Sequence, residues 1–100
     1  MEYIFEWNPK KARSNQRKHG VTFDEASAVF GDPLALLMRD ADHSLDEERY
    51  LVLGMSKQQR LLVVAFAERP PRTRLISARP ATAAERKRYE EEDESSQPES

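Results

Sequence analysis

The first twenty residues pass from an alternating strand pattern of aromatic side chains to a polar helix. Over residues 3–7, aromatic residues alternate with Ile4 and Glu6, which predicts a first strand. Asn8 and Pro9 are typical of a helix start, with Asn as the N-cap and Pro at the first helical position. The helix is polar nearly all round, and Gly20 is a good residue to end it.

A second helix is predicted over residues 23–30. Thr22 precedes it as a cap, and Glu25 stands three residues later, as in a capping box. Its apolar stripe consists of Phe23, Ala26 and Phe30. We expect this stripe, together with the aromatic residues of the first strand, to supply part of the core.

The rest of the chain reads as short strands followed by one more helix. Strands are predicted over residues 34–38, 48–55, 60–67 and 73–79, and Thr82 with Glu85 caps a last helix. The order is β-α-α-β-β-β-β-α, an α+β fold with an antiparallel sheet, because tight turns favour a meander. We expect all three helices to cover one sheet face and leave the other partly open. The domain should span residues 1–92, with an acidic disordered tail over 93–100.

The composition of the chain excludes some kinds of site and favours others. The chain has 100 residues and no cysteine, which fits one domain and excludes disulfides and thiol nucleophiles. It contains no apolar run long enough to cross a bilayer and no signal-peptide pattern at its start, so we expect a cytoplasmic protein. Six of the 18 acidic residues fall in the last eleven positions, which leaves a body with 16 basic and 12 acidic residues. A net charge of +4 there is compatible with an anionic partner such as nucleic acid.

Arg79 is the first candidate for chemistry, at the end of the last strand. Ser77 shares its face because strand side chains alternate. A guanidinium matches phosphate oxygens and stays charged, although pairing with a surface carboxylate is an equally good interpretation. Tyr89, on the last helix, either covers the same surface or fixes that helix to the sheet.

Further polar candidates lie on the third strand and the first helix. Glu48 and Arg49 open their strand and should point to opposite faces, as site residues or as a solvated charge pair. His19 is a possible general acid or base, or a favourable charge at the helix C-terminus. Lys11, Asn15 and Lys18 share a helix face with it.

Acidic residues of the loop over residues 40–46 offer a possible divalent-ion site. They are Asp40, Asp42 and Asp46, together with His43. Their spacing matches no defined metal loop. We therefore predict neither a metal site nor a cofactor.

In these pieces the chain resembles the BrnT family, the toxin half of BrnT–BrnA type II toxin–antitoxin systems. The resemblance extends from residue 4 to residue 90 and rests on F-E-W-N-P-K-K (5–11), N-Q-R-K-H-G-V-T-F-D-E-A (15–26), V-F-G-D-P (29–33), E-E-R-Y-L-V-L-G (47–54), R-L-L-V-V (60–64) and R-L-I-S-A-R-P-A-T-A-A-E-R-K-R-Y-E (74–90). Asn8 and Ala67 depart from it, since the family often has Asp and Thr there.

The resemblance implies a RelE-like ribonuclease fold and RNA cleavage that blocks translation. It also implies a ribbon-helix-helix antitoxin, BrnA-like, that forms a hetero-oligomer with the toxin and binds operator DNA. The family's polar positions fall on Lys11, Asn15, Lys18, His19, Glu48, Arg49, Ser77, Arg79 and Tyr89. Of these, Arg79, Glu48, His19 and Arg49 are predicted to be catalytic and the other five to bind RNA.

The expected reaction needs no metal. The ribose 2′-oxygen attacks the adjacent phosphorus, Arg79 stabilises the developing charge, and Glu48 or His19 takes the proton. Two alternatives remain: a non-catalytic domain that only binds an antitoxin or regulates transcription with it, and a metal-dependent nuclease that uses the acidic loop.

Overall fold

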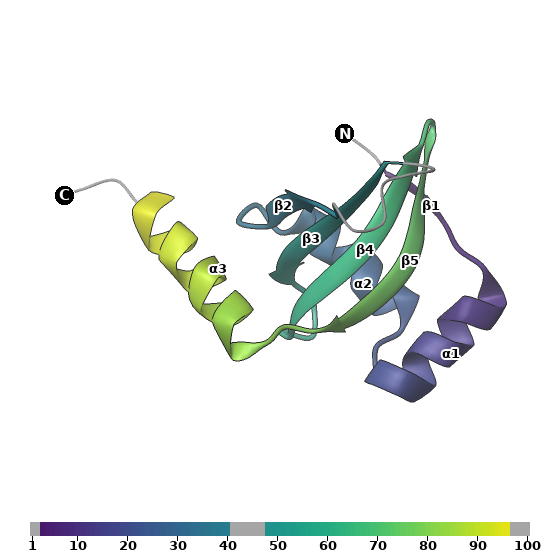
Figure 1. Cartoon of the computed structure of the whole chain (residues 1–100), viewed down its shortest axis with the longest axis horizontal. Coiled ribbons are helices and arrows are strands. Elements are labelled where there is room, and N and C mark those ends of the chain that lie inside the picture. The colour runs from purple at the N-terminus through teal and green to yellow at the C-terminus, as the bar shows by residue number, and fades with distance from the viewer. Residues whose placement is uncertain (1–2, 41–47, 97–100) are drawn as a thin grey trace.

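A computed structural model of the chain describes residues 3–40 and 48–96. The elements follow the predicted order (Figure 1). They are β1 (Ile4–Glu6), α1 (Pro9–His19), α2 (Phe23–Ala28), the 3₁₀ turn η1 (Val29–Gly31), β2 (Leu36–Arg39), β3 (Arg49–Met55), β4 (Leu61–Arg69), β5 (Arg72–Pro80) and α3 (Ala83–Ser96).

The strands form one five-stranded sheet in the order β1-β5-β4-β3-β2. The predicted meander is confirmed, because β2 to β5 pair antiparallel with their neighbours along the chain. The expectation of a wholly antiparallel sheet is wrong at one edge, where β1 pairs parallel with β5. Helices α1 and α2 carry the chain from that edge to the opposite one, so β1 and β5 meet without a hairpin.

The predicted helix ends are confirmed for α1. The Asn8 side chain accepts a hydrogen bond from the Lys10 amide at 2.8 Å, and Gly20 takes the left-handed conformation with φ of 70°. The capping box of α2 is only half formed. Thr22 accepts from the Glu25 amide, but the Glu25 carboxylate accepts from Ser56 and Arg60. The Glu25 side chain, which the local motif predicts to cap the helix, instead makes tertiary contacts with Ser56 and Arg60.

The main core lies between the sheet and the α1–α2 layer, and we call this side of the sheet the α2 face. Phe23 and Ala26 are buried there, and Phe5, Trp7 and Phe30 pack against them, as expected. The other members of this cluster come from alternate strand positions: Val52, Leu62, Val64, Phe66, Leu75 and Ala78.

Helix α3 packs on the opposite side, the α3 face, so the expectation of three helices on one face is wrong (Figure 1). Tyr89 contacts a second buried cluster there, formed by Leu53, Leu61 and Val63. The central strands β3 and β4 are apolar at consecutive positions, so both faces of the sheet need cover. Tyr89 is the buried residue of α3 between positions 83 and 92, and the rest of the α3 face stays open.

The last helix continues to Ser96, past the predicted domain end at residue 92. Glu is a good helix former, so the acidic run extends the helix without needing a buried face. Residues 97–100 of the predicted tail lie outside the described part of the chain. None of the described helices is both long and apolar enough to span a bilayer.

Candidate functional site

Ser77 and Arg79 lie on the α3 face, as their alternation predicts. They pair with Ala65 and Val63 of β4, and Val63 belongs to the cluster on that face. The pairing of β5 with β4 contains a β-bulge: Ala65 pairs with Ser77 and Phe66 with Leu75, so position 76 has no partner in the register. Leu75 and Ala78 can therefore both enter the core on the α2 face.

The Arg79 guanidinium is held by a carboxylate. Nη1 and Nη2 donate to Oε1 and Oε2 of Glu85, each at 2.9 Å, and Nη1 also donates to the Pro80 carbonyl at 3.3 Å. Glu85 completes the capping box of α3 by accepting from the Thr82 amide at 2.8 Å. The pair ties the start of α3 to the end of β5, and 38% of the Arg79 side chain remains exposed. The alternative interpretation of Arg79, pairing with a carboxylate, is therefore the one present in this structure.

The ion pair makes a pH-dependent contribution to folding. The hydrogen bonds from Arg79 lower the pKa of Glu85 from its ordinary 4.5 to about 2, against the opposing effect of burial. Because the folded pKa is the lower one, the stabilisation is complete above pH 4.5 and is lost as the pH falls toward 2.

Replacing Glu85 with Gln tests this contribution, because Gln can still cap the helix but carries no charge. We expect Glu85→Gln to lower the free energy of unfolding at pH 7, with a difference from the wild type that shrinks toward pH 2, measured by urea denaturation across that range. A difference that stays constant with pH would contradict the assignment.

Four arginines gather on the α3 face at the other end of β4 and β5, and we call them the arginine patch. Arg49 and Arg74 both pair with Ala67, one from each neighbouring strand, and Arg69 pairs directly with Arg72. Alternation places all four on the α3 face, since Phe66 and Leu75 point to the opposite one. The carboxylate that faces them from β1 is that of Glu6.

The arginine patch concentrates positive charge on one side of the sheet, which makes it a candidate anion site. Glu6 lies 3.1 Å from Arg74 and 3.9 Å from Arg72, so one carboxylate serves two of the four cations. Like charges directly opposite each other on neighbouring strands destabilise a sheet, and Arg69 with Arg72 is such a pair. A bound phosphate would relieve that repulsion. Sequence reasoning missed Arg69 and Arg72 as a pair because only the hairpin register brings them together.

The predicted catalytic residues do not converge on one point. Glu48 accepts a hydrogen bond from the Tyr50 hydroxyl at 2.5 Å and lies 3.6 Å from Arg39, on the α2 face. Arg49 lies on the α3 face, so the expected opposition of Glu48 and Arg49 is confirmed. Arg79 pairs with position 63 of β4 and Arg49 with position 67, a separation of about 13 Å along the strand. The structure thus places Arg79 and Arg49 on one face and Glu48 on the other.

Helix α1 supplies a second, separate cationic surface. Lys11 and Lys18 are exposed and His19 is half-buried. Asn15 is buried, because its amide donates to the carbonyls of Val21 and Ala78 and its oxygen accepts from the Ala78 amide. Its three hydrogen bonds fix α1 to β5, so this side chain has a structural role and is not available to RNA here. The described residues of α1 include no acid, and five Lys or Arg side chains are exposed on it: Lys10, Lys11, Arg13, Arg17 and Lys18.

Comparison of the chain with models of protein families identifies its family. The family model described as the ribonuclease toxin BrnT of a type II toxin–antitoxin system matches residues 7–85. The chain belongs to the BrnT family. Ribonuclease activity, an RNA target and an antitoxin partner are properties of that family. All five α3-face arginines named above fall inside the matched region, whereas most of α3, including Tyr89, lies beyond it.

A solved BrnT structure has the same fold. The crystal structure of the Brucella abortus ribonuclease toxin BrnT, at 1.1 Å resolution, superposes with a TM-score of 0.62 and 19% sequence identity. The match covers 81% of this chain and 99% of that one. Among curated proteins, none is similar enough in sequence to count as a relative.

Tyr89 fixes α3 of this BrnT chain to the sheet. Its hydroxyl donates to the Asp32 carboxylate at 2.6 Å, and that carboxylate also accepts from the amides of Leu34 and Met55. Burial raises the pKa of Asp32, but these hydrogen bonds outweigh it and hold the pKa below its ordinary value. Of the two interpretations of Tyr89, the contacts favour the anchor over the RNA-binding residue.

The structure describes too little of the acidic loop to assess it as a metal site. Residues 41–47, including Asp42, His43 and Asp46, lie outside the described residues. Among residues 3–40 and 48–96, no three His, Asp or Glu side chains are close enough together to hold a metal ion.

Proposed function

We propose that this chain is a ribonuclease toxin that stops translation by cutting RNA without a metal ion. The observation that supports this most is the family match together with the α3 face. The matched region contains Arg79 and the whole arginine patch, and these five cations lie on one side of the sheet. An RNA strand lying along this face would contact the arginine patch at one end of β4 and β5 and Arg79 at the other end.

In the proposed reaction the RNA supplies its own nucleophile. The 2′-oxygen attacks the adjacent phosphorus, the bond to the 5′-oxygen breaks, and a 2′,3′-cyclic phosphate and a 5′-hydroxyl result. Arg79 stabilises the charge on the phosphate, with Ser77 beside it, and Arg49 and Arg74 hold a second phosphate further along the RNA. Lys11 and Lys18 bind more distant parts of the RNA.

Of the two predicted bases, His19 fits this arrangement better than Glu48. Glu48 lies just before Arg49, at the end of the strands far from Arg79. His19 ends α1 at the same end of the sheet as Arg79, because Arg60, just before β4, donates to the Gly20 carbonyl at 3.0 Å. An imidazole nitrogen can accept a proton and later donate it, as a general base and then a general acid require.

We also propose the remaining family features for this chain. They are a RelE-like fold, a cytoplasmic location, and neutralisation by a BrnA-like ribbon-helix-helix antitoxin in a hetero-oligomer that binds operator DNA through the antitoxin. The alternative is a non-catalytic domain that only binds its antitoxin. The pairing of Arg79 with Glu85 favours that alternative, because the paired guanidinium must change partners to bind phosphate.

Expression of the chain separates the two functions. We expect induction alone to arrest growth and fragment cellular RNA, and co-expression of the protein encoded beside it to restore growth. The double variant Arg49→Ala, Arg74→Ala should relieve the arrest, whereas Arg88→Ala, exposed on α3, should not. Growth without arrest, combined with a stable complex with the neighbouring protein, would favour the non-catalytic function.

A further inference from the structure

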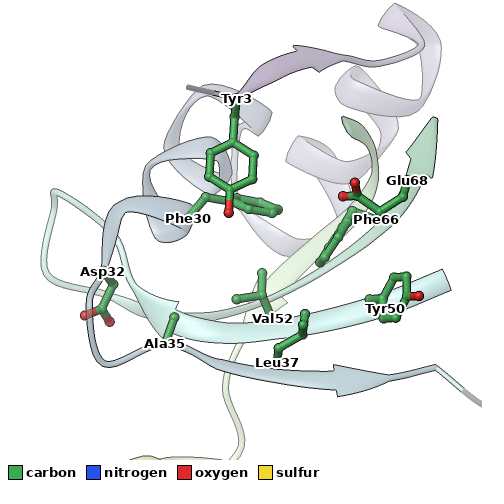
Figure 2. A pocket seen from close by; sticks show the side chains of 9 residues that line it. All are labelled: Tyr3, Phe30, Asp32, Ala35, Leu37, Tyr50, Val52, Phe66 and Glu68. Carbon is green, nitrogen blue, oxygen red and sulfur yellow. The ribbon is translucent and has the colours of Figure 1, made fainter. Parts of the chain in front are cut away.

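An apolar groove lies on the α2 face, beyond the area that α2 covers. Figure 2 shows it between η1 and the start of β1 on one side and strands β2 to β4 on the other. It has a volume of about 540 Å³. Its apolar lining consists of Tyr3, Phe30, Ala35, Leu37, Tyr50, Val52 and Phe66.

Much of this lining is exposed. The structure describes four large apolar side chains as exposed, and two of them, Leu37 at 65% and Tyr3 at 48%, line the groove. The rings of Phe30 and Phe66 behind them are packed edge to face, with centroids 4.9 Å apart, so the floor is already formed. An exposed apolar surface with a formed floor is typical of a binding site for another protein.

The charge around the groove is negative. Asp32 and Glu68 line it, and Glu48 is hydrogen-bonded to the Tyr50 hydroxyl at its edge. Arg39 lies 3.6 Å from Glu48 and offsets one of these three carboxylates. Phosphates would be repelled here, whereas a segment with a basic side chain would be attracted, so the groove suits a protein segment and the opposite face suits RNA.

The groove is bordered by an edge strand. Strand β2 ends the sheet, and in the described residues no strand pairs with its outer side. Arg49 accepts from the Asp40 amide, so Met38 and Leu36 also use their backbone groups toward β3. The N–H and C=O groups of Leu37 and Arg39 consequently point outward, where an added strand can bind them.

We propose that this groove binds an extended segment of the antitoxin. The segment pairs with β2, places aliphatic side chains against Leu37, Tyr3 and Phe30, and places a Lys or Arg against Glu68. The proposal rests on the antitoxin partner of the proposed function. It adds that the partner is held on the face opposite the arginine patch, by apolar contacts and not through the RNA-binding cations.

Two exposed leucines provide a matched test. Leu37 lines the groove, whereas Leu34, 38% exposed, lies just before β2 and is not part of the lining. The protein encoded beside this chain is co-expressed with it, and the affinity of each purified full-length variant for that protein is measured by calorimetry. We expect Leu37→Asp to raise Kd at least ~30-fold, as loss of a central contact does, and Leu34→Asp to change it less than ~3-fold. Glu68→Arg should also weaken binding.

Several outcomes would overturn the proposal. Wild-type affinity in Leu37→Asp would show that the antitoxin does not use the groove. Loss of RNA cleavage in the free Leu37→Asp variant would give the groove to RNA, and a wild-type dimer that Leu37→Asp converts to a monomer would give it to a second copy of the chain. If the wild type cuts RNA but does not bind the neighbouring protein, the groove proposal fails while the ribonuclease stands. If it binds that protein without cutting RNA, the ribonuclease fails while the groove is still tested by affinity.

Discussion

RNA that carries a 2′-O-methyl group at the cleaved nucleotide is expected to resist cutting at that position, while unmodified RNA is cut in the presence of EDTA. The methyl group removes the proposed nucleophile, so the effect should be complete at the modified position and absent at unmodified ones. In the proposed reaction, Arg79 and the arginine patch on the α3 face supply the positive charge that a metal ion would otherwise supply. Product ends identify the chemistry, because attack by the 2′-oxygen leaves 2′,3′-cyclic or 3′-phosphate ends.

The experiment also addresses the metal-dependent alternative. The methylated and the unmodified RNA differ only in one methyl group. Each is incubated with the purified protein, once in EDTA and once in magnesium. Cleavage of the methylated position, or a requirement for magnesium with 5′-phosphate products, would make water the nucleophile. Attention would then turn to the acidic residues of the loop, Asp40, Asp42 and Asp46.

Replacing Arg79 with Ala is expected to lower the rate of RNA cleavage by about 10²–10³, the usual loss when one charge-assisted contact to a transition state is removed. The structure makes a second interpretation possible, since Arg79 also holds Glu85 at the start of α3. A loss of activity in Arg79→Ala alone would not distinguish phosphate binding from helix anchoring.

Glu85→Gln is the matched control. It breaks the same ion pair, keeps the helix cap and leaves the guanidinium in place. If Arg79 acts on phosphate, Glu85→Gln should retain cleavage while Arg79→Ala loses it, and both should unfold at similar temperatures. Equal losses in both variants would assign Arg79 to anchoring α3. Arg79→Lys adds a further comparison, because it keeps the charge and loses the planar fork.

If the groove and the arginine patch act as proposed, substrate and antitoxin bind opposite faces of the same strands. Tyr50 and Arg49 are neighbours on β3, and Glu68 and Arg69 are neighbours on β4, with one of each pair on each face. A partner held along β2 would then leave the arginine patch on the other face uncontacted unless it extended around the sheet edge. Mutations in the groove and in the arginine patch should consequently affect partner binding and cleavage separately.

The sequence by itself determined the elements and their order. Local signals sufficed because caps and turns are made by neighbours in the chain: Asn8 and Gly20 bound α1, and Thr82 with Glu85 starts α3. Strand alternation placed Ser77 with Arg79 and opposed Glu48 to Arg49 for the same reason. The BrnT resemblance was also readable, since its motifs are short runs of residues.

Only the tertiary structure decided which residues meet. The parallel pairing of β1 with β5, the position of α3 on the second face and the opposition of Arg69 to Arg72 depend on contacts between distant segments. Asn15 looked like a surface residue on a polar helix, yet its amide bonds a strand 63 positions away. The spacing of hydrophobic and polar residues indicates on which face of a helix or strand a side chain lies. Which segment covers that face depends on close packing and on hydrogen bonding of buried polar groups, which involve residues distant in sequence.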